Sequence, residues 1–225
     1  MHDTAFEISE TFFLTYVANG ARVLELGSES FNGSIRDGQV HRSFNYVGCD
    51  LRFGEGVDVV TDANADRLPF DNENFDAAVA SSVFEHDDFF WDTFLRLCHV
   101  VRPGGVIYLN VPSNGWIHRY SVDNWRFYPD AGHALVKWAQ RNGQSVTLVE
   151  SFTVCRRQDV WNDFCAVFCK GSTENIPEGR LNQVHVGDNL YDMNNDDMKN
   201  ETNLGEDSRI IKQLRQQLAL DATDE

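Results

Sequence analysis

The chain has 225 residues and a formal net charge of -16 at pH 7, from 35 acidic and 19 basic side chains. This balance disfavours nucleic acid as a partner, because protein–nucleic acid affinity comes mostly from Lys and Arg that neutralise phosphates. Five cysteines without a C-x-x-C pair predict neither a zinc site nor a disulfide framework, and they indicate a reduced, cytoplasmic protein. We expect no membrane insertion, because no signal segment opens the chain and no apolar run approaches roughly 20 residues.

The N-terminal residues predict a short helix that acts as a lid or docks on the domain. Thr4 and Glu7 have the Ser/Thr-x-x-Glu form of a capping box, and Asn19-Gly20 is a stop signal. Apolar residues recur between them at helical spacing: Phe6, Phe13, Tyr16 and Val17.

After this helix, apolar runs alternate with helical patterns, which predicts an α/β fold with a parallel sheet and helices on both faces. We expect strands near 22–26, 45–50, 57–60, 75–80 and 105–111. We expect helices near 34–40, 87–101 and 129–142. The runs at 144–154 and 164–170 follow as two strands without an intervening helix, which brings the predicted sheet to seven strands.

Residues 171–225 predict an acidic, largely flexible C-terminal extension, because Asn, Asp, Glu and Gly dominate and few large apolar residues remain. A short helix is predicted at 208–220 from the helical spacing of Ile210, Ile211, Leu214 and Leu218. It either docks on the domain or on a second copy, or remains a marginal solvated helix. The sequence is compatible with either a monomer or a homodimer.

The most informative motif is an apolar run that breaks at Gly27, followed about twenty residues later by a second run that ends in Asp50. Ligands of open α/β sheets bind beyond the carboxyl ends of the strands, so we expect both residues to face a ligand. A carboxylate there can accept two hydrogen bonds from a ribose diol. The pattern indicates a nucleotide-cofactor site; the alternative for Asp50 is an exposed strand-end carboxylate.

Further motifs follow in chain order: Thr61-Asp62-Ala63, Leu68-Pro69-Phe70, Asn74-Phe75-Asp76, Glu85-His86 and Arg102-Pro103-Gly104-Gly105. Together with the glycine turn they resemble the class I S-adenosylmethionine-dependent methyltransferases over about residues 20–170. The resemblance implies a Rossmann-like, doubly wound, mostly parallel sheet of seven strands with an antiparallel last strand, in a domain of residues 1–170. Within that superfamily, three segments resemble a bacterial branch often associated with glycan biosynthesis: Gly27-Ser28 with Asn32-Gly33-Ser34, Val57-Asp58-Val59 and 120–127.

The resemblance implies S-adenosylmethionine as cofactor. It places Glu25 near the amino group of the cofactor and Asp62 and Ala63 at the adenine. Glu29 and Phe31 stand where many relatives carry further glycines, so the loop must take another path. The expected cofactor-binding residues are Glu25, Gly27, Ser28, Asn32, Gly33, Asp50, Leu51, Asp62, Ala63 and Ser81.

Methyl transfer from a sulfonium requires mainly alignment of the acceptor and exclusion of water, and a base helps when the acceptor is a hydroxyl or a protonated amine. Candidates lie after the fourth strand, at Glu85 and His86, and after the fifth, at His118, Tyr120, Asp123 and Arg126. Of these, His86, His118 and Asp123 are the expected catalytic residues, with loop-holding roles as the alternative. Arg126 either steers an anionic acceptor or forms a structural ion pair. No spacing of His, Asp and Glu demands a metal.

The leading hypothesis is a cytoplasmic methyltransferase for a small molecule, through O-methylation of a sugar or glycan precursor. The first alternative is a quinone, lipid or other small metabolite as acceptor. The second is a non-catalytic scaffold that retains the fold. An NAD-linked dehydrogenase would share the strand-end acid but would not explain the closing strand pair.

Overall fold

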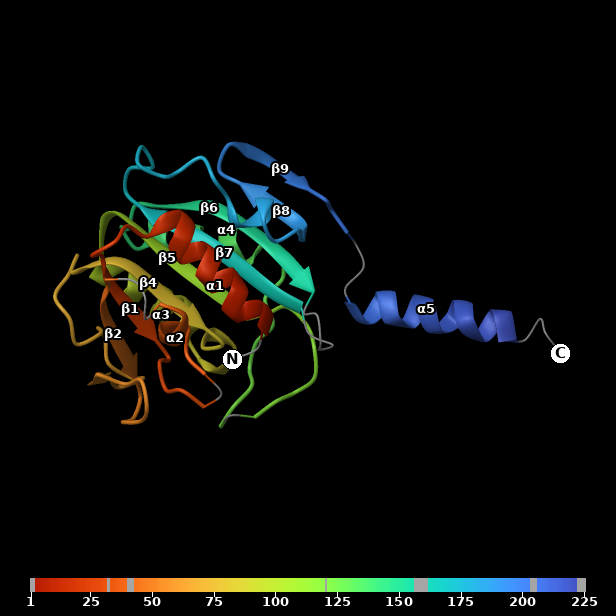
Figure 1. The fold of residues 1–225 in the computed structure, drawn as a ribbon, viewed down its shortest axis with the longest axis horizontal. Helices are drawn as coiled ribbons and strands as arrows, with labels where there is room; N and C mark the ends of the chain where they lie inside the picture. The colour runs from red at the N-terminus through yellow and green to blue at the C-terminus, as the bar shows by residue number, and fades with distance from the viewer. Residues whose placement is uncertain are drawn as a thin grey trace.

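One nine-stranded sheet runs through the part of the chain that the structure describes, in the order β3-β2-β1-β4-β5-β7-β6-β8-β9 (Figure 1). The computed structural model describes residues 3–31, 33–39, 43–119, 121–155, 162–202 and 206–221. The strands are β1 (Arg22–Leu26), β2 (Asn45–Asp50), β3 (Val59–Val60), β4 (Phe75–Ser81), β5 (Val101–Pro112), β6 (Val146–Cys155), β7 (Asn162–Lys170), β8 (Asp188–Asp192) and β9 (Asn195–Lys199).

The sheet confirms the predicted α/β class, and it corrects the strand count. Strands β1 to β5 pair in parallel, and β7 is antiparallel to both β5 and β6, as expected for the closing pair. The prediction of seven strands is wrong, because β8 pairs antiparallel with β6 and β9 with β8.

Helices cover both faces of the sheet, as predicted. The helices are α1 (Asp3–Tyr16), α2 (Ile35–Gly38), α3 (Phe90–Val100), α4 (Ala131–Arg141) and α5 (Glu206–Asp221), with the short 3-10 helices η1 (Phe84–His86) and η2 (Leu181–Gln183). Figure 1 shows α1 in front of the strands, and α1 and α2 share one core with Val23 and Tyr108. Helices α3 and α4 pack on the opposite face, against residues such as Leu109 and Phe168.

Helix α1 is part of the core and not a lid. Its residues Ile8, Phe12 and Phe13 are fully buried, and the Phe12 ring stacks on Tyr108 of β5 at 4.8 Å between centroids. The helix also begins before the predicted cap: Thr4 lies inside it, and the backbone N–H of Thr4 donates to Asp3 Oδ1 (2.8 Å).

Part of the expected flexible extension is ordered, which corrects the prediction for residues 181–199. Glu150 of β6 is fully buried and accepts hydrogen bonds from the Tyr16 hydroxyl (2.6 Å) and from the backbone N–H groups of Leu181 (2.8 Å) and Asn182 (3.2 Å). It therefore ties η2 and α1 to the sheet edge on which β8 pairs. The polar composition of residues 171–225 does not predict this order, because the residue that holds η2 is Glu150 of the earlier strand β6.

Helix α5 includes the predicted 208–220 and extends away from the sheet in Figure 1. Its side chains Ile211, Leu214 and Leu218 are exposed. No helix among the described residues is long and apolar enough to cross a membrane.

The variant Glu150→Ala is expected to lower the free energy of unfolding by about 3 kcal/mol, because it leaves buried donors without an acceptor. Urea unfolding measures this change, with Glu174→Ala as a control at an exposed acidic residue. Equal stability of the two variants would show that the carboxylate does not hold η2.

Candidate functional site

The predicted site residues lie towards or beyond the carboxyl ends of the parallel strands β1 to β5, which all meet at one edge of the sheet. This is the edge at which open α/β sheets bind their ligands. The order β3-β2-β1-β4-β5 reverses direction between β1 and β4, so the loops after these two strands flank the switch point.

Gly27 ends β1 in a tight turn that packs against the loop after β4. Its φ is +76°, a left-handed conformation, and its N–H donates to the Cys49 carbonyl (2.9 Å). A Cβ at this position would lie 2.2 Å from Cγ2 of Val83. Ser82, with a φ of 55°, turns the chain after β4 and brings Val83 there. Glycine is thus required both by the backbone conformation and by the close approach of two loops.

Asp50 ends β2 and connects the loops after β1 and β2. Its Oδ2 accepts from the backbone N–H of Glu29 (2.8 Å), and its Oδ1 accepts from that of Leu51 (2.6 Å). An ionised carboxylate has about four lone-pair sites, so both oxygens can accept a further bond. Glu29 forms an ion pair with Arg52 (2.7 Å) that joins the same two loops.

Glu25 lies below this loop, inside the domain. Its Oε2 accepts from the hydroxyls of Tyr46 (2.9 Å) and Ser34 (3.4 Å), and Ser34 also caps α2. Burial raises the pKa of the Glu25 carboxyl from 4.5 to about 7. In this arrangement Glu25 supports the start of α2.

The stability of the chain is expected to depend on pH through Glu25. Because the pKa of Glu25 is raised on folding, the folded chain binds the proton of this carboxyl more tightly than the unfolded chain does. The resulting stabilisation is fully present below about pH 4.5 and is lost as the pH rises through about 7. From about pH 5 to pH 8 the free energy of unfolding should fall by about 2.5 kcal/mol through this group. Glu25→Gln should remove that part of the fall in urea unfolding. Parallel pH curves for wild type and variant would contradict the assignment.

The other expected cofactor residues differ in exposure. Ser28 and Ser81 each have a buried hydroxyl oxygen with no hydrogen-bond partner among the described residues. Leu51 is exposed, as are Asp62 and Ala63, where the Asp62 carboxylate accepts from the backbone N–H of Asn64 (2.9 Å).

Gly33 has a φ of +91°, a left-handed conformation. Asn32 and Tyr120 lie outside the described residues.

Three side chains from two loops form a cluster that we call the Glu85–His86–His118 cluster. One ligand atom of each lies within 4.8 Å of the others, and the two imidazole rings meet edge to face with 5.0 Å between centroids. Glu85 is almost fully buried, and its Oε1 lies 3.7 Å from Nε2 of His86. Burial raises the pKa of Glu85 to about 8, and burial lowers the pKa of His118.

Asp123 and Arg126 hold the loop after β5 in place beside this cluster. The guanidinium donates from both terminal nitrogens to the Asp123 carboxylate (2.6 and 2.8 Å), which lowers the pKa of Asp123 to about 2. Asp123 Oδ2 accepts from the backbone N–H of His118 (2.7 Å) and lies 3.4 Å from its Nδ1. Arg126 therefore forms a structural ion pair with Asp123, and Asp123 contacts both the backbone and the ring of His118.

The two loops are also joined directly. Nδ1 of His86 lies 2.6 Å from the Val122 carbonyl and must donate to it, because a carbonyl only accepts. The Glu85 carbonyl accepts from the backbone N–H groups of Asn124 (2.7 Å) and Trp125 (3.2 Å). Glu85, a candidate that the sequence predicts after the fourth strand, lies next to His86 in this site.

Aromatic side chains lie on the same two loops as the cluster. Phe127 is buried and packs on Phe90 (4.9 Å between centroids). Trp125, Phe89 and Trp116 remain exposed on the same two loops. They provide apolar faces beside the cluster.

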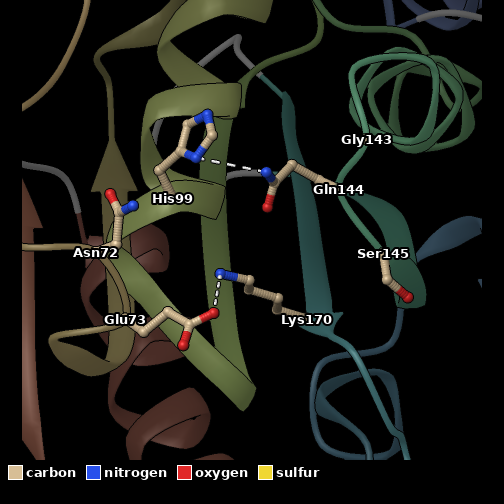
Figure 2. Close-up of a pocket in the computed structure, with 7 residues that line it drawn as sticks. All are labelled: Asn72, Glu73, His99, Gly143, Gln144, Ser145 and Lys170. Carbon is tan, nitrogen blue, oxygen red and sulfur yellow. Dashed lines mark hydrogen bonds and ion pairs between the residues drawn. The ribbon is translucent and has the colours of Figure 1, made fainter.

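A separate polar hollow lies at the opposite edge of the sheet, where Lys170 ends β7 (Figure 2). Its Nζ donates to the Val101 carbonyl (2.9 Å) and pairs with Glu73 (3.4 Å), and Gln144 lies 3.4 Å from His99. These contacts hold Lys170 within the fold, and none of the predicted site residues lines the hollow.

Comparison with protein families gives one match: residues 40–109, from just before β2 into β5, match a family model described as "Methyltransferase domain". No curated protein sequence matches the chain.

Solved structures similar to this chain include the 1,6-didemethyltoxoflavin-N1-methyltransferase of Burkholderia thailandensis with bound 1,6-didemethyltoxoflavin and S-adenosylhomocysteine. It is 17% identical with a TM-score of 0.57, over 75% of this chain and 79% of that one. The [4+2]-cyclase SpnF is 13% identical with a TM-score of 0.53, over 74% and 82%. A putative methyltransferase in complex with the Trm112 activator of Haloferax volcanii is 16% identical with a TM-score of 0.51, over 76% and 95%. At these identities the likeness shows a shared fold.

Proposed function

We propose that the chain is an S-adenosylmethionine-dependent methyltransferase that acts on a small-molecule acceptor. The observation that carries the proposal is Asp50, a carboxylate with spare lone pairs at the end of β2, next to the switch point of a sheet whose β2–β5 region matches a methyltransferase domain. The similar structure from Burkholderia thailandensis contains S-adenosylhomocysteine, which supports the choice of cofactor.

The residues present fit this cofactor in their chemistry. Asp50 would accept hydrogen bonds from the two ribose hydroxyls. The loop after β1 contains Ser28, whose buried hydroxyl has no partner among the described residues. Leu51 directly follows Asp50, and Asp62 follows Thr61, whose backbone N–H donates to the Asp50 carbonyl (2.8 Å). Both Leu51 and Asp62 are exposed and would meet the adenine. When bound, the cofactor supplies a methyl group on a sulfonium, which is a strong electrophile.

The Glu85–His86–His118 cluster would meet the acceptor. It lies in the loops after β4 and β5, on the other side of the switch point from Asp50. The ion pair of Asp123 with Arg126 fixes the loop that carries His118, so that the acceptor atom and the cofactor can be aligned. His86 and His118 are the candidates for taking a proton from a hydroxyl acceptor; Asp123, held ionised by Arg126, is a positioning residue.

A sugar or glycan precursor is the acceptor that we favour. The exposed faces of Trp116 and Trp125 suit the apolar face of a sugar ring, and segments of this sequence resemble a branch associated with glycan biosynthesis. Cys49, Cys98, Cys165 and Cys169 are buried thiols outside any disulfide, which supports a reaction in the cytoplasm. A quinone or lipid acceptor would use the same aromatic surface.

A second candidate function is a binding or cyclase role without methyl transfer. The [4+2]-cyclase SpnF shares the fold, so fold alone does not establish methyl transfer. Glu29 and Phe31, in place of further glycines, favour this alternative.

Calorimetric titration with S-adenosylmethionine and S-adenosylhomocysteine tests the proposal. We expect both to bind with micromolar affinity, and we expect NAD+ to show no binding. Absence of binding to the folded protein would exclude the methyltransferase. Binding of both, with no acceptor methylated in a screen of sugars, sugar nucleotides, quinones and lipids, would favour the second candidate.

A further inference from the structure

We propose that Glu85, His86 and His118 together bind one divalent transition-metal ion. Two imidazoles and a carboxylate place their ligand atoms within 4.8 Å of one another. Atoms that each bind one ion at about 2.0–2.2 Å lie about 3–4 Å apart, so a small adjustment of the side chains completes the site. The spacing in the sequence gave no indication of it, because the ligands come from the loops after two different strands.

The buried carboxylate of Glu85 is an independent indication of a cation. Glu85 is 1% exposed, and its Oε2 is buried without a hydrogen-bond partner among the described residues. A buried, unsatisfied carboxylate oxygen is costly, and the acidic groups of Asp123 and Asp163 disfavour its charge further. A bound cation would satisfy this oxygen and offset the local negative charge.

The surroundings of both histidines match those of metal ligands. Since Nδ1 of His86 donates to the Val122 carbonyl, Nε2 is the nitrogen left to bind a metal ion, and it lies 3.7 Å from Oε1 of Glu85. His118 lies beside the carboxylate of Asp123, which Arg126 holds ionised. Metal-bound histidines usually have a carbonyl or carboxylate as the partner of the other nitrogen, and this partner fixes the orientation of the ring.

The donor set selects the class of metal. Imidazole nitrogens with one carboxylate suit Zn²⁺, Mn²⁺, Fe²⁺, Co²⁺ and Ni²⁺, whereas Mg²⁺ and Ca²⁺ prefer all-oxygen sites. Three protein ligands leave a coordination position for an oxygen of the acceptor, and a Lewis acid there would lower the pKa of an acceptor hydroxyl. When the metal ion is bound, His86 and His118 act as its ligands and not as bases. This role rests on the proposed function; the binding of the metal does not.

Titration of the metal-free, untagged, full-length protein with Co²⁺ tests the proposal, because bound Co²⁺ has visible absorption bands that report its ligands. We expect one Co²⁺ per chain, displaced by Zn²⁺. His86→Ala and His118→Ala should each weaken binding about 100-fold. His133→Ala is the matched control, because His133 of α4 contacts Tyr191 and lies outside the cluster. No stoichiometric binding, or equal binding by all variants, would overturn the proposal.

A measurement on the wild-type protein keeps the test valid if a variant fails to fold. Zn²⁺ should protect His86 and His118 from modification by diethyl pyrocarbonate, mapped by mass spectrometry, and leave His133 reactive. Unchanged modification of the pair would overturn the metal site.

The same samples separate this proposal from the proposed function. Titration with S-adenosylhomocysteine in the presence of a chelator reports the cofactor site alone. If the nucleoside binds and Co²⁺ does not, only the metal proposal fails. If Co²⁺ binds and the nucleoside does not, only the proposed function fails.

Discussion

Asp50→Ala is expected to weaken the binding of S-adenosylhomocysteine at least 100-fold. The variant removes both acceptors of the ribose diol, and charge-assisted hydrogen bonds contribute about 1.5–3 kcal/mol each. Two such bonds correspond to between two and four powers of ten in affinity. Isothermal titration calorimetry measures the change directly.

Asp50 also accepts backbone N–H groups from Glu29 and Leu51, so loss of binding must be distinguished from disorder of the loops. Asp58→Ala is a matched control, because the Asp58 carboxylate likewise accepts a backbone N–H, that of Gly48 (2.8 Å). Asp58 lies between β2 and β3 and is not one of the residues predicted to bind the ribose. We expect the control to bind within about threefold of wild type. Equal losses in both variants would show that Asp50 acts only through the loop.

Gly27→Ala is expected to lower the free energy of unfolding by about 2–4 kcal/mol. The new Cβ would lie 2.2 Å from Cγ2 of Val83, and the left-handed φ of +76° costs about 1–2 kcal/mol for a residue with a Cβ. Urea unfolding measures the loss. The variant should also bind S-adenosylhomocysteine more weakly, because the shifted turn adjoins the predicted ligand.

A double-mutant cycle separates the two causes. In Gly27→Ala/Val83→Ala the collision is removed, so the double variant should be at least 1 kcal/mol more stable than the sum of the single variants predicts. Gly20→Ala is the control for backbone conformation alone, because its φ is +80° and nothing lies within 4 Å of the added Cβ. Its cost should be about 1 kcal/mol. Additive effects in the cycle would mean that Val83 does not restrict this turn.

The sequence predicts the elements of the first half of the sheet closely, because each is a short apolar run between turn residues. The bounds of β1 and β2 agree with the prediction, and Asp50 ends β2 as expected. The later strands β8 and β9 are not predicted from the sequence, because edge strands need few apolar residues. In addition, Glu150, which holds the segment before them, lies far away in the chain.

The candidate site could be predicted only in parts. His86 and His118 are recognisable as titratable residues after two strands, but their meeting depends on how the loops fold over the sheet. The sequence leaves two roles open for Arg126, and only its bidentate contact with Asp123 decides between them. The sequence does not indicate that Glu85 is buried, because η1 has only three residues and shows no apolar periodicity.

The most direct test of the methyltransferase assignment is a crystal structure of the protein with S-adenosylhomocysteine. We predict the ribose hydroxyls on Asp50 at the end of β2 and the sulfur facing the Glu85–His86–His118 cluster. The ligand bound elsewhere, such as at the opposite edge beside Lys170, or absent from crystals grown at saturating concentration, would contradict the assignment.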